Sequence, residues 1–176
     1  MNPSSPTTAL QLRSLVQANG TLQISLELSP VPTPGPDEVL IQVQATPINP
    51  SDIGLLLGPA DLSTVQVTGT AERPVATASI PERAMPGMAA RLGQSMPVGN
   101  EGAGLVVAAG ASPAAQALLG RTVAVIGGAM YSQYRSMPAA QCLPLPPGTT
   151  AAEGASCFVN PLTALSMVET MKREGH

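Results

Sequence analysis

Residues 34–52 carry the strongest structural signal in this chain and read Pro34-Gly-Pro-Asp-Glu-Val-Leu-Ile-Gln-Val-Gln-Ala-Thr-Pro-Ile-Asn-Pro-Ser-Asp52. Within this stretch, residues 37–46 alternate. The apolar side chains of Val39, Ile41 and Val43 point one way, while Gln42 and Gln44 point the other. A period of two is typical of a strand with one buried face. The prolines at positions 47 and 50 then end the strand, so a turn follows and leads into one or two helical turns.

On the N-terminal side, the sequence predicts two more strands, over residues 10–17 and 22–28. Asn19-Gly20 lies between them, and this pair favours a tight hairpin in which both central residues take positive φ. Four prolines in residues 30–36 exclude helix and central strand, so this part is predicted to be an extended connector. Residues 1–8 are polar and are expected to form a flexible tail.

On the C-terminal side, the pattern of residues 61–97 is less clear. Residues 63–78 are rich in Thr and Val and predict a small hairpin. Residues 82–94 predict a short helix, in which Met85 and Met88 are spaced to face one side. We interpret these methionines as part of a satellite core rather than as a cofactor site.

The remaining residues predict several short strands and then two helices. Glycines punctuate a strand over residues 99–110, and shorter strands follow at 121–126, 131–137 and 141–145. Thr150 and Glu153 have the spacing of a capping box, and Asn160-Pro161 is typical of a second helix start, with Asn160 as the N-cap. This order predicts a mainly β domain followed by the beginning of another domain.

The composition excludes several classes of protein. The chain has 176 residues, a net charge of −3 and 11% charged residues, against about 25% in an ordinary soluble domain. Eight cations without any run of them, and three aromatic residues in all, argue against a nucleic-acid partner. Residues 102–120 lack charge but are too rich in glycine for a membrane span, and no secretory signal opens the chain. We therefore expect a soluble, cytoplasmic protein with neither a nucleic-acid nor a membrane partner.

Cysteine and histidine are scarce. Cys142 and Cys157 are the only cysteines and are predicted to be small buried hydrophobic residues. His176 is the only histidine and is the last residue, so a histidine-dependent triad or a histidine-rich metal site is not expected within this chain.

Six ordered motifs resemble the N-terminal part of the medium-chain dehydrogenase/reductase superfamily. The similarity is greatest to its zinc-free NADPH:quinone oxidoreductase branch, with the 2-enoyl thioester reductases next. The motifs are Pro-Gly-Pro-Asp-Glu-Val-Leu-Ile (34–41), Ile-Asn-Pro-Ser-Asp (48–52), Gly-Asn-Glu-Gly-Ala-Gly (99–104), Gly-Ala-Met-Tyr-Ser-Gln-Tyr (128–134), Leu-Pro-Leu-Pro-Pro-Gly (143–148) and Asn-Pro-Leu-Thr-Ala (160–164).

The resemblance implies a GroES-like, partly open β-barrel with short helices, over residues 9–150 with an apparent insertion at about 61–97. In this family a Rossmann domain follows and holds the nicotinamide cofactor, and the active site lies between the two domains. Residues 151–176 resemble the helical start of that second domain. No Gly-rich phosphate-binding turn is present. We therefore expect this chain to be one half of an oxidoreductase and to be inactive alone. The resemblance also implies that the full-length form is a homodimer.

The resemblance also implies that no zinc is bound. Zinc-dependent relatives carry a cysteine where this sequence has Asn49-Pro50-Ser51 and a histidine at the position of Asn100, so both soft ligands are missing. Glu101 on its own cannot hold a catalytic zinc. We expect Glu101 to be buried and paired, with Arg121 as one possible partner.

The implied chemistry is hydride transfer from NADPH to a quinone or to an activated carbonyl or enone. Asn49 and Tyr131 are the candidate catalytic residues. Asn49 would lie near the nicotinamide or the substrate carbonyl, but it could equally be a turn residue before Pro50. Tyr131 could reach the active site, although a tyrosine at the edge of a β-barrel is more often structural. The candidate cofactor-binding residues are Asn49, Asn160 and Thr163. Asn160 could instead cap its helix, and Thr163 could bond back to a helix carbonyl.

One departure from the enoyl reductases bears on the expected substrate. Those enzymes use a tyrosine as proton donor where this sequence has Ala60, which cannot donate a proton. Enoyl reduction by that route is therefore not expected. A second hypothesis is a non-enzymatic GroES-like module that acts by binding or by assembly, with residues 61–97 as its only candidate for a mobile loop.

Overall fold

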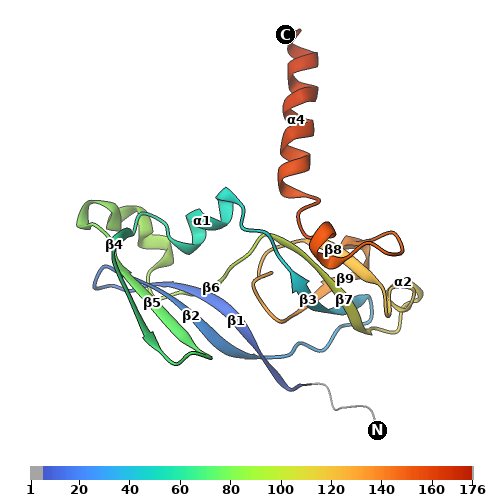
Figure 1. Ribbon diagram of the computed structural model, residues 1–176, viewed down its shortest axis with the longest axis horizontal. Coiled ribbons are helices and arrows are strands. Elements are labelled where there is room, and N and C mark those ends of the chain that lie inside the picture. The colour runs from blue at the N-terminus through green and yellow to red at the C-terminus, as the bar shows by residue number, and fades with distance from the viewer. Residues whose placement is uncertain (1–5, 176) are drawn as a thin grey trace. The chain divides into compact units, whose positions relative to one another are not determined.

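The computed structural model describes residues 6–175 and divides into two compact units (Figure 1). The first unit comprises the residues up to 31 together with 50–98, and the second comprises 32–49 together with 99–176. Of the expected flexible tail of residues 1–8, residues 1–5 lie outside the described part, and Thr8 already belongs to a strand.

The first unit is built on a five-stranded antiparallel sheet with the order β4-β5-β2-β1-β6. The expected hairpins over residues 10–28 and 63–78 are both present, as β1–β2 and β4–β5. The elements are β1 (Thr8–Val16), β2 (Thr21–Pro30), α1 (Pro50–Leu56), β4 (Asp61–Gly69), β5 (Pro74–Ser79), the 3₁₀ helix η1 (Glu82–Arg91) and β6 (Ser95–Pro97).

The turn between β1 and β2 differs from the expected tight hairpin. Gly20 has φ +79°, but Asn19 does not take a positive φ. The loop is longer than two residues, because the N–H of Gln17 donates to the carbonyl of Thr21 at 2.8 Å and the N–H of Gly20 donates to the carbonyl of Gln17 at 3.1 Å. Such longer loops need one left-handed residue, and glycine supplies it.

A small core holds this unit together. Val16, Leu22 and Ile80 are buried, and Met85 and Met88 of η1 pack against them. The prediction that these methionines belong to a satellite core is therefore confirmed.

The second unit contains another five-stranded antiparallel sheet, with the order β10-β8-β7-β3-β9. Strand β3 corresponds to the alternating stretch of residues 37–46, and it lies between β7 and β9. The elements are β3 (Glu38–Ala45), β7 (Glu101–Ala109), α2 (Pro113–Gln116), β8 (Thr122–Ile126), β9 (Tyr134–Pro138), the 3₁₀ helix η2 (Ala139–Gln141), β10 (Cys142–Pro144), α3 (Ala151–Gly154) and α4 (Val159–Glu174).

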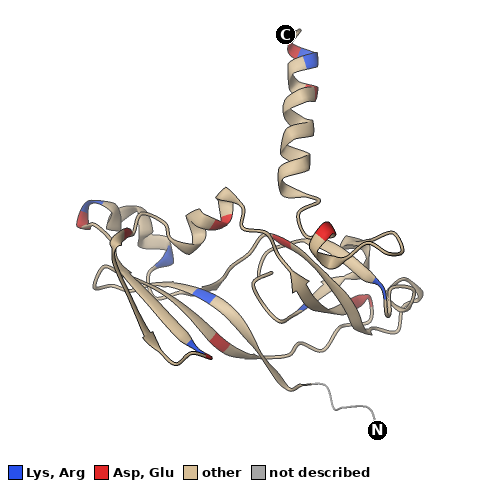
Figure 2. Ribbon diagram, viewed as in Figure 1, with Lys and Arg blue, Asp and Glu red and all other residues tan. Residues whose placement is uncertain are grey.

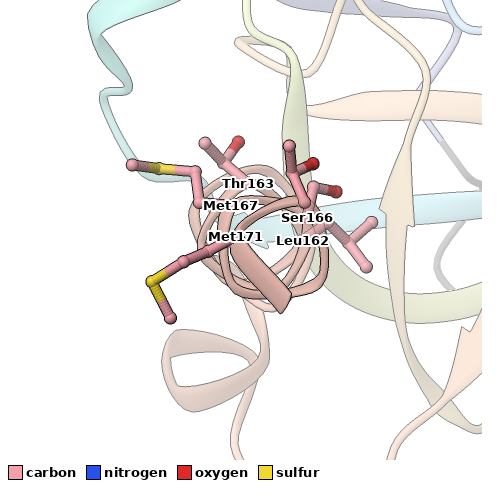
Figure 3. A pocket seen from close by; sticks show the side chains of 6 residues that line it. Leu162, Thr163, Ser166, Met167 and Met171 are labelled. Carbon is pink, nitrogen blue, oxygen red and sulfur yellow. The ribbon is translucent and has the colours of Figure 1, made fainter. Parts of the chain in front are cut away.

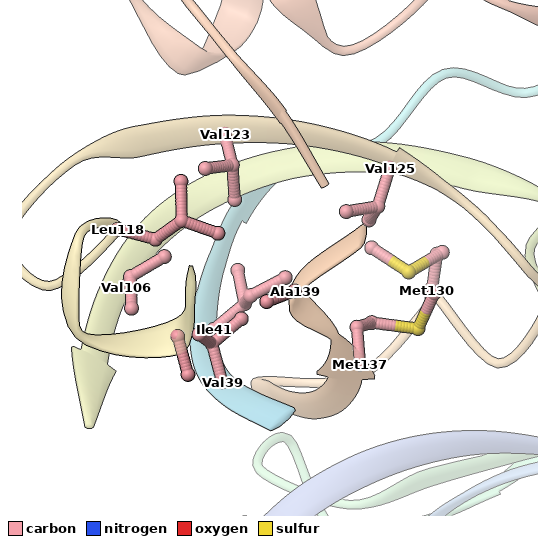
Figure 4. Packing of buried hydrophobic residues seen from close by; sticks show 10 residues of the cluster. Val39, Ile41, Val106, Leu118, Val123, Val125, Met130, Met137 and Ala139 are labelled. Carbon is pink, nitrogen blue, oxygen red and sulfur yellow. The ribbon is translucent and has the colours of Figure 1, made fainter. Parts of the chain in front are cut away.

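The main core lies in the second unit (Figure 4). The alternation of β3 places Val39 and Ile41 inside it, where neither has any exposed surface. Val106, Val123 and Met130 come to the same cluster from later parts of the chain. Together with the sheets, this core confirms the expectation of a mainly β protein that ends in helices.

Two helices close the chain. Helix α3 begins with the predicted capping box, in which Thr150 accepts from the N–H of Glu153 while the Glu153 carboxylate accepts from the N–H of Thr150. These bonds are strongest when the carboxylate is ionised, so they hold the pKa of Glu153 below its ordinary value. Helix α4 follows, ends at Gly175 as expected, and has no buried residue along its length.

Candidate functional site

Asn49 lies near the end of residues 34–52, between β3 and α1, and has no exposed surface. Its amide nitrogen Nδ2 donates to Oε1 of Glu101 at 3.1 Å. Its amide oxygen Oδ1 accepts from Nδ2 of Asn160 at 3.1 Å. The structure thus brings together two of the predicted site residues, Asn49 and Asn160, which lie 111 positions apart in the chain.

Glu101 is the first residue of β7 and is also fully buried. Its second oxygen, Oε2, accepts from the backbone N–H groups of Phe158 at 2.9 Å and Val159 at 3.0 Å, where α4 begins. A carboxylate in this place satisfies helix-start donors and is favoured by the helix dipole. Glu101 therefore connects the Asn49 turn to the start of α4.

The predicted pairing of Glu101 with Arg121 is wrong. Arg121 is exposed, and in the part of the chain that the structure describes the single ion pair joins Lys172 to Glu169. Glu101 is buried and paired as expected, but its partners are an amide and two backbone N–H groups. The sequence could not reveal them, because the three partners lie 52, 57 and 58 positions away.

Helix α4 begins earlier than predicted. Phe158 is its N-cap residue and makes no side-chain cap, so Asn160 lies inside the first turn and does not cap the helix. The side chain of Asn160 instead donates to Asn49. Thr163, one turn further on, is exposed, and its hydroxyl donates to the carbonyl of Val159 at 2.7 Å.

Tyr131 is half-buried beside the end of β3. Its hydroxyl donates to the backbone carbonyl of Pro47 at 2.9 Å, two residues before Asn49. A small hollow of about 190 Å³ lies beside the ring, lined by Val43, Gln44, Ala45, Thr46, Met130, Tyr131 and Ser132. Small-molecule sites usually enclose about 300–1,000 Å³, so this hollow could form only part of one.

A larger open surface lies along α4. Six residues of this helix line a space of about 630 Å³, which Figure 3 shows in a view along the helix: Leu162, Thr163, Ser166, Met167, Thr170 and Met171. Because a single helix supplies every one of these residues, the space is an open helix face and not an enclosed cavity. Figure 2 shows that the charges of α4 lie near its C-terminal end, at Glu169 and residues 172–174, so this face is mainly apolar.

The described residues supply no evident metal site. No group of three or more His, Cys, Asp or Glu residues within 6–175 is arranged to hold a metal ion. Around Asn49, both oxygens of Glu101 already accept hydrogen bonds, and Asn49 and Asn160 are weak zinc ligands. None of the helices in this range combines the length and the hydropathy that crossing a bilayer requires.

Both cysteines are less acidic than free cysteine. Burial raises the pKa of the Cys142 thiol to about 11. Burial also raises the pKa of the Cys157 thiol, and the negative charge of Glu101 adds to this effect. Both are free thiols and only partly buried, so the expectation of small buried hydrophobic residues is met in part.

We expect Cys142 to react very slowly with alkylating reagents at pH 8. A pKa of about 11 leaves only ~0.1% of the thiol as reactive thiolate at that pH. Iodoacetamide labelling, followed by mass spectrometry in a Cys157→Ser background, should be about 100-fold slower in the native protein than in guanidinium, and should accelerate between pH 8 and 10. Equal rates in the two states would contradict the burial of Cys142.

Comparisons with known proteins agree with the resemblance found in the sequence. Residues 35–147 match the model of the alcohol dehydrogenase GroES-like domain. A structure described as an NADPH:quinone reductase, from Mesorhizobium loti, is 27% identical with a TM-score of 0.66; the match covers 98% of this chain and 46% of that one. A search of curated proteins gives no match.

Two more distant structures share the fold. One, from Bacillus thuringiensis and also described as an NADPH:quinone reductase, is 22% identical with a TM-score of 0.61 and covers 94% of this chain and 42% of its own. A quinone oxidoreductase from Coxiella burnetii is 16% identical with a TM-score of 0.62, covering 94% and 45%. The chain therefore spans less than half the length of these structures.

Proposed function

We propose that this chain, which belongs to the family of alcohol dehydrogenase GroES-like domains, forms the substrate-side domain of an NADPH-dependent, zinc-free oxidoreductase. The acceptor would be a quinone or another activated carbonyl or enone. The similarity to structures described as NADPH:quinone reductases supports this proposal.

The observation that carries the proposal is the hydrogen-bonded chain from Glu101 through Asn49 to Asn160. It links the buried Asn49 of the Asn-Pro motif to the exposed Asn160 in the first turn of α4. The apolar face of α4 begins beside the amide of Asn160. Among the described residues, no other helix or strand covers this face. Such a surface suits the flat ring of a nicotinamide, which is apolar on its faces and carries a polar carboxamide.

The same residues fit the nicotinamide end of NADPH and not its phosphates. Phosphates bind where backbone N–H groups at a helix start are available. Here the N–H groups of Phe158 and Val159 already donate to the carboxylate of Glu101, whose negative charge would also repel a phosphate. We therefore place the binding of the phosphates outside this chain, in a Rossmann domain that residues 151–176 would lead into.

Each predicted site residue then has a distinct part. NADPH, when bound, supplies the hydride. Asn160 and Thr163 line the exposed surface of α4 and would contact the cofactor. Asn49 is buried and would act through Asn160 as a positioning residue, while the ring of Tyr131 would border the acceptor beside the hollow at the end of β3. The absence of zinc, the cytoplasmic location and the homodimer remain predictions.

The test compares NADPH binding to this chain alone and to a chimera. In the chimera, α4 is continued by the part of the Mesorhizobium loti protein that this chain does not match. We expect NADPH fluorescence to show saturable binding, and benzoquinone to be reduced, only with the chimera. The chain alone should show no saturation up to about 1 mM NADPH, where binding is worth only about 4 kcal/mol. A folded chimera that binds NADPH but reduces no quinone or enone would contradict the proposed acceptor class.

A further inference from the structure

We propose that Glu101 is a positioning residue that fixes the direction of the hydrogen bonds that run from Asn160 through Asn49 to its carboxylate. It thereby holds the amide oxygen of Asn160 at the exposed surface. This inference rests on the proposed function for its ligand. The structural part stands on the contacts of three side chains, Glu101, Asn49 and Asn160.

The direction of these hydrogen bonds follows from the chemistry of Glu101, at the buried end of the series. Both oxygens of the Glu101 carboxylate accept hydrogen bonds, whereas an amide donates from its nitrogen and accepts at its oxygen. Because Oε1 of Glu101 is an acceptor, Asn49 turns its NH₂ toward the carboxylate and its oxygen away from it, and burial of both residues leaves no water to take the place of either partner. That oxygen then accepts the NH₂ of Asn160, so every donor in the series points toward Glu101.

The other oxygen of Glu101 holds this series of hydrogen bonds in place. It accepts from the N–H groups of Phe158 and Val159 at 2.9 and 3.0 Å, so the carboxylate cannot turn away without leaving two helix-start donors unsatisfied. Asn160 is on the same first turn and is exposed. A ligand group that meets its oxygen must be a hydrogen-bond donor, such as the NH₂ of a carboxamide or a hydroxyl.

Exchanging the chemical roles of two residues tests this arrangement. Asn49→Asp places two carboxylates side by side, and we expect the melting temperature at pH 7 to fall by about 10 °C. Adding Glu101→Gln should restore it to within about 3 °C of the parent. The glutamine can donate to the carboxylate introduced at position 49 while its oxygen accepts from the N–H groups at the start of α4.

Glu101→Gln alone gives a second, independent readout. In this variant the side-chain amides at positions 101, 49 and 160 can each exchange the places of their oxygen and NH₂. Asn160 then presents its NH₂ to solvent in place of its oxygen. Nuclear magnetic resonance should then show the Asn160 side-chain NH₂ exchanging with water about tenfold faster than in the parent, with protection regained in the double variant. A merely structural role for Glu101 would not reverse this side chain.

Matched controls isolate the effect of position from that of the substitution. Asn19→Asp lies in an exposed turn where the side-chain oxygen accepts from the N–H of Thr21, and Glu169→Gln lies on the exposed surface of α4. Both should shift the melting temperature by less than about 2 °C.

Each outcome either supports or overturns the proposal. Rescue of Asn49→Asp by Glu101→Gln supports it. Purely additive losses, or a harmless Asn49→Asp, would overturn it, as would unchanged exchange of the Asn160 amide. No measurement involves NADPH, so the result stands apart from the test of the proposed function.

Discussion

Gly104→Ala is expected to destabilise this protein by about 3 kcal/mol, which corresponds to a fall of roughly 10 °C in melting temperature. Gly104 lies in β7, opposite Val43 of β3 and beside a register shift in that pair of strands. A Cβ atom at this position would collide with the backbone carbonyl of Gln42 and would lie 2.8 Å from the Cα of Val43. Backbone atoms at the centre of a sheet cannot move aside as a flexible side chain can.

The matched control is Gly54→Ala, the same substitution at an exposed position of helix α1. No atom lies within 4 Å of the Cβ that it adds, and alanine favours a helix by up to about 1 kcal/mol over glycine. Urea unfolding of both variants should therefore give changes of opposite sign. If Gly104→Ala were as harmless as Gly54→Ala, the close pairing of β3 with β7 would be wrong.

Ile41→Ala is expected to cost about 3–4 kcal/mol, because it removes three carbon atoms from the centre of the main core and leaves a cavity. Ile41 has no exposed surface and lies in the cluster of Figure 4 with Val106, Val123 and Met137. The loss should appear as a lower urea midpoint with an unchanged slope.

Ile48→Ala is the control from the same stretch of sequence. Ile48 is 72% exposed, so its truncation should change the free energy of unfolding by no more than about 0.5 kcal/mol. Similar losses for the two variants would contradict the assignment of the buried face of β3.

Much of the fold could be predicted from local patterns. The alternation of residues 37–46 identified β3 and its buried face, and the Thr150/Glu153 spacing identified the start of α3. Period and capping chemistry act within a few residues, so a sequence displays them directly. The start of α4 was placed two residues too late at its N-cap, because the residue that satisfies its first N–H groups is Glu101, far away in the chain.

The candidate site could be predicted only in part. The sequence motifs contained Asn49, Glu101 and Asn160, which the structure joins by hydrogen bonds; the functional roles predicted for Asn49 and Asn160 stay predictions. Their joint arrangement did not follow from the motifs, and the expected partner Arg121 is exposed and does not bind Glu101. Nothing in the composition of either segment indicates that an amide and two backbone N–H groups would satisfy a buried carboxylate.

Local patterns were therefore enough to establish a mainly β chain that ends in helices, because strand periodicity, turn residues and helix caps each depend on a few neighbouring residues. The GroES-like fold was implied only by the resemblance of the six motifs to a known family. The connection that the carboxylate of Glu101 makes between the turn at Asn49 and the start of α4 became visible only in the folded chain. Burial removes water, so each polar group must find a partner within the protein, and the groups that come within reach depend on how the strands pair.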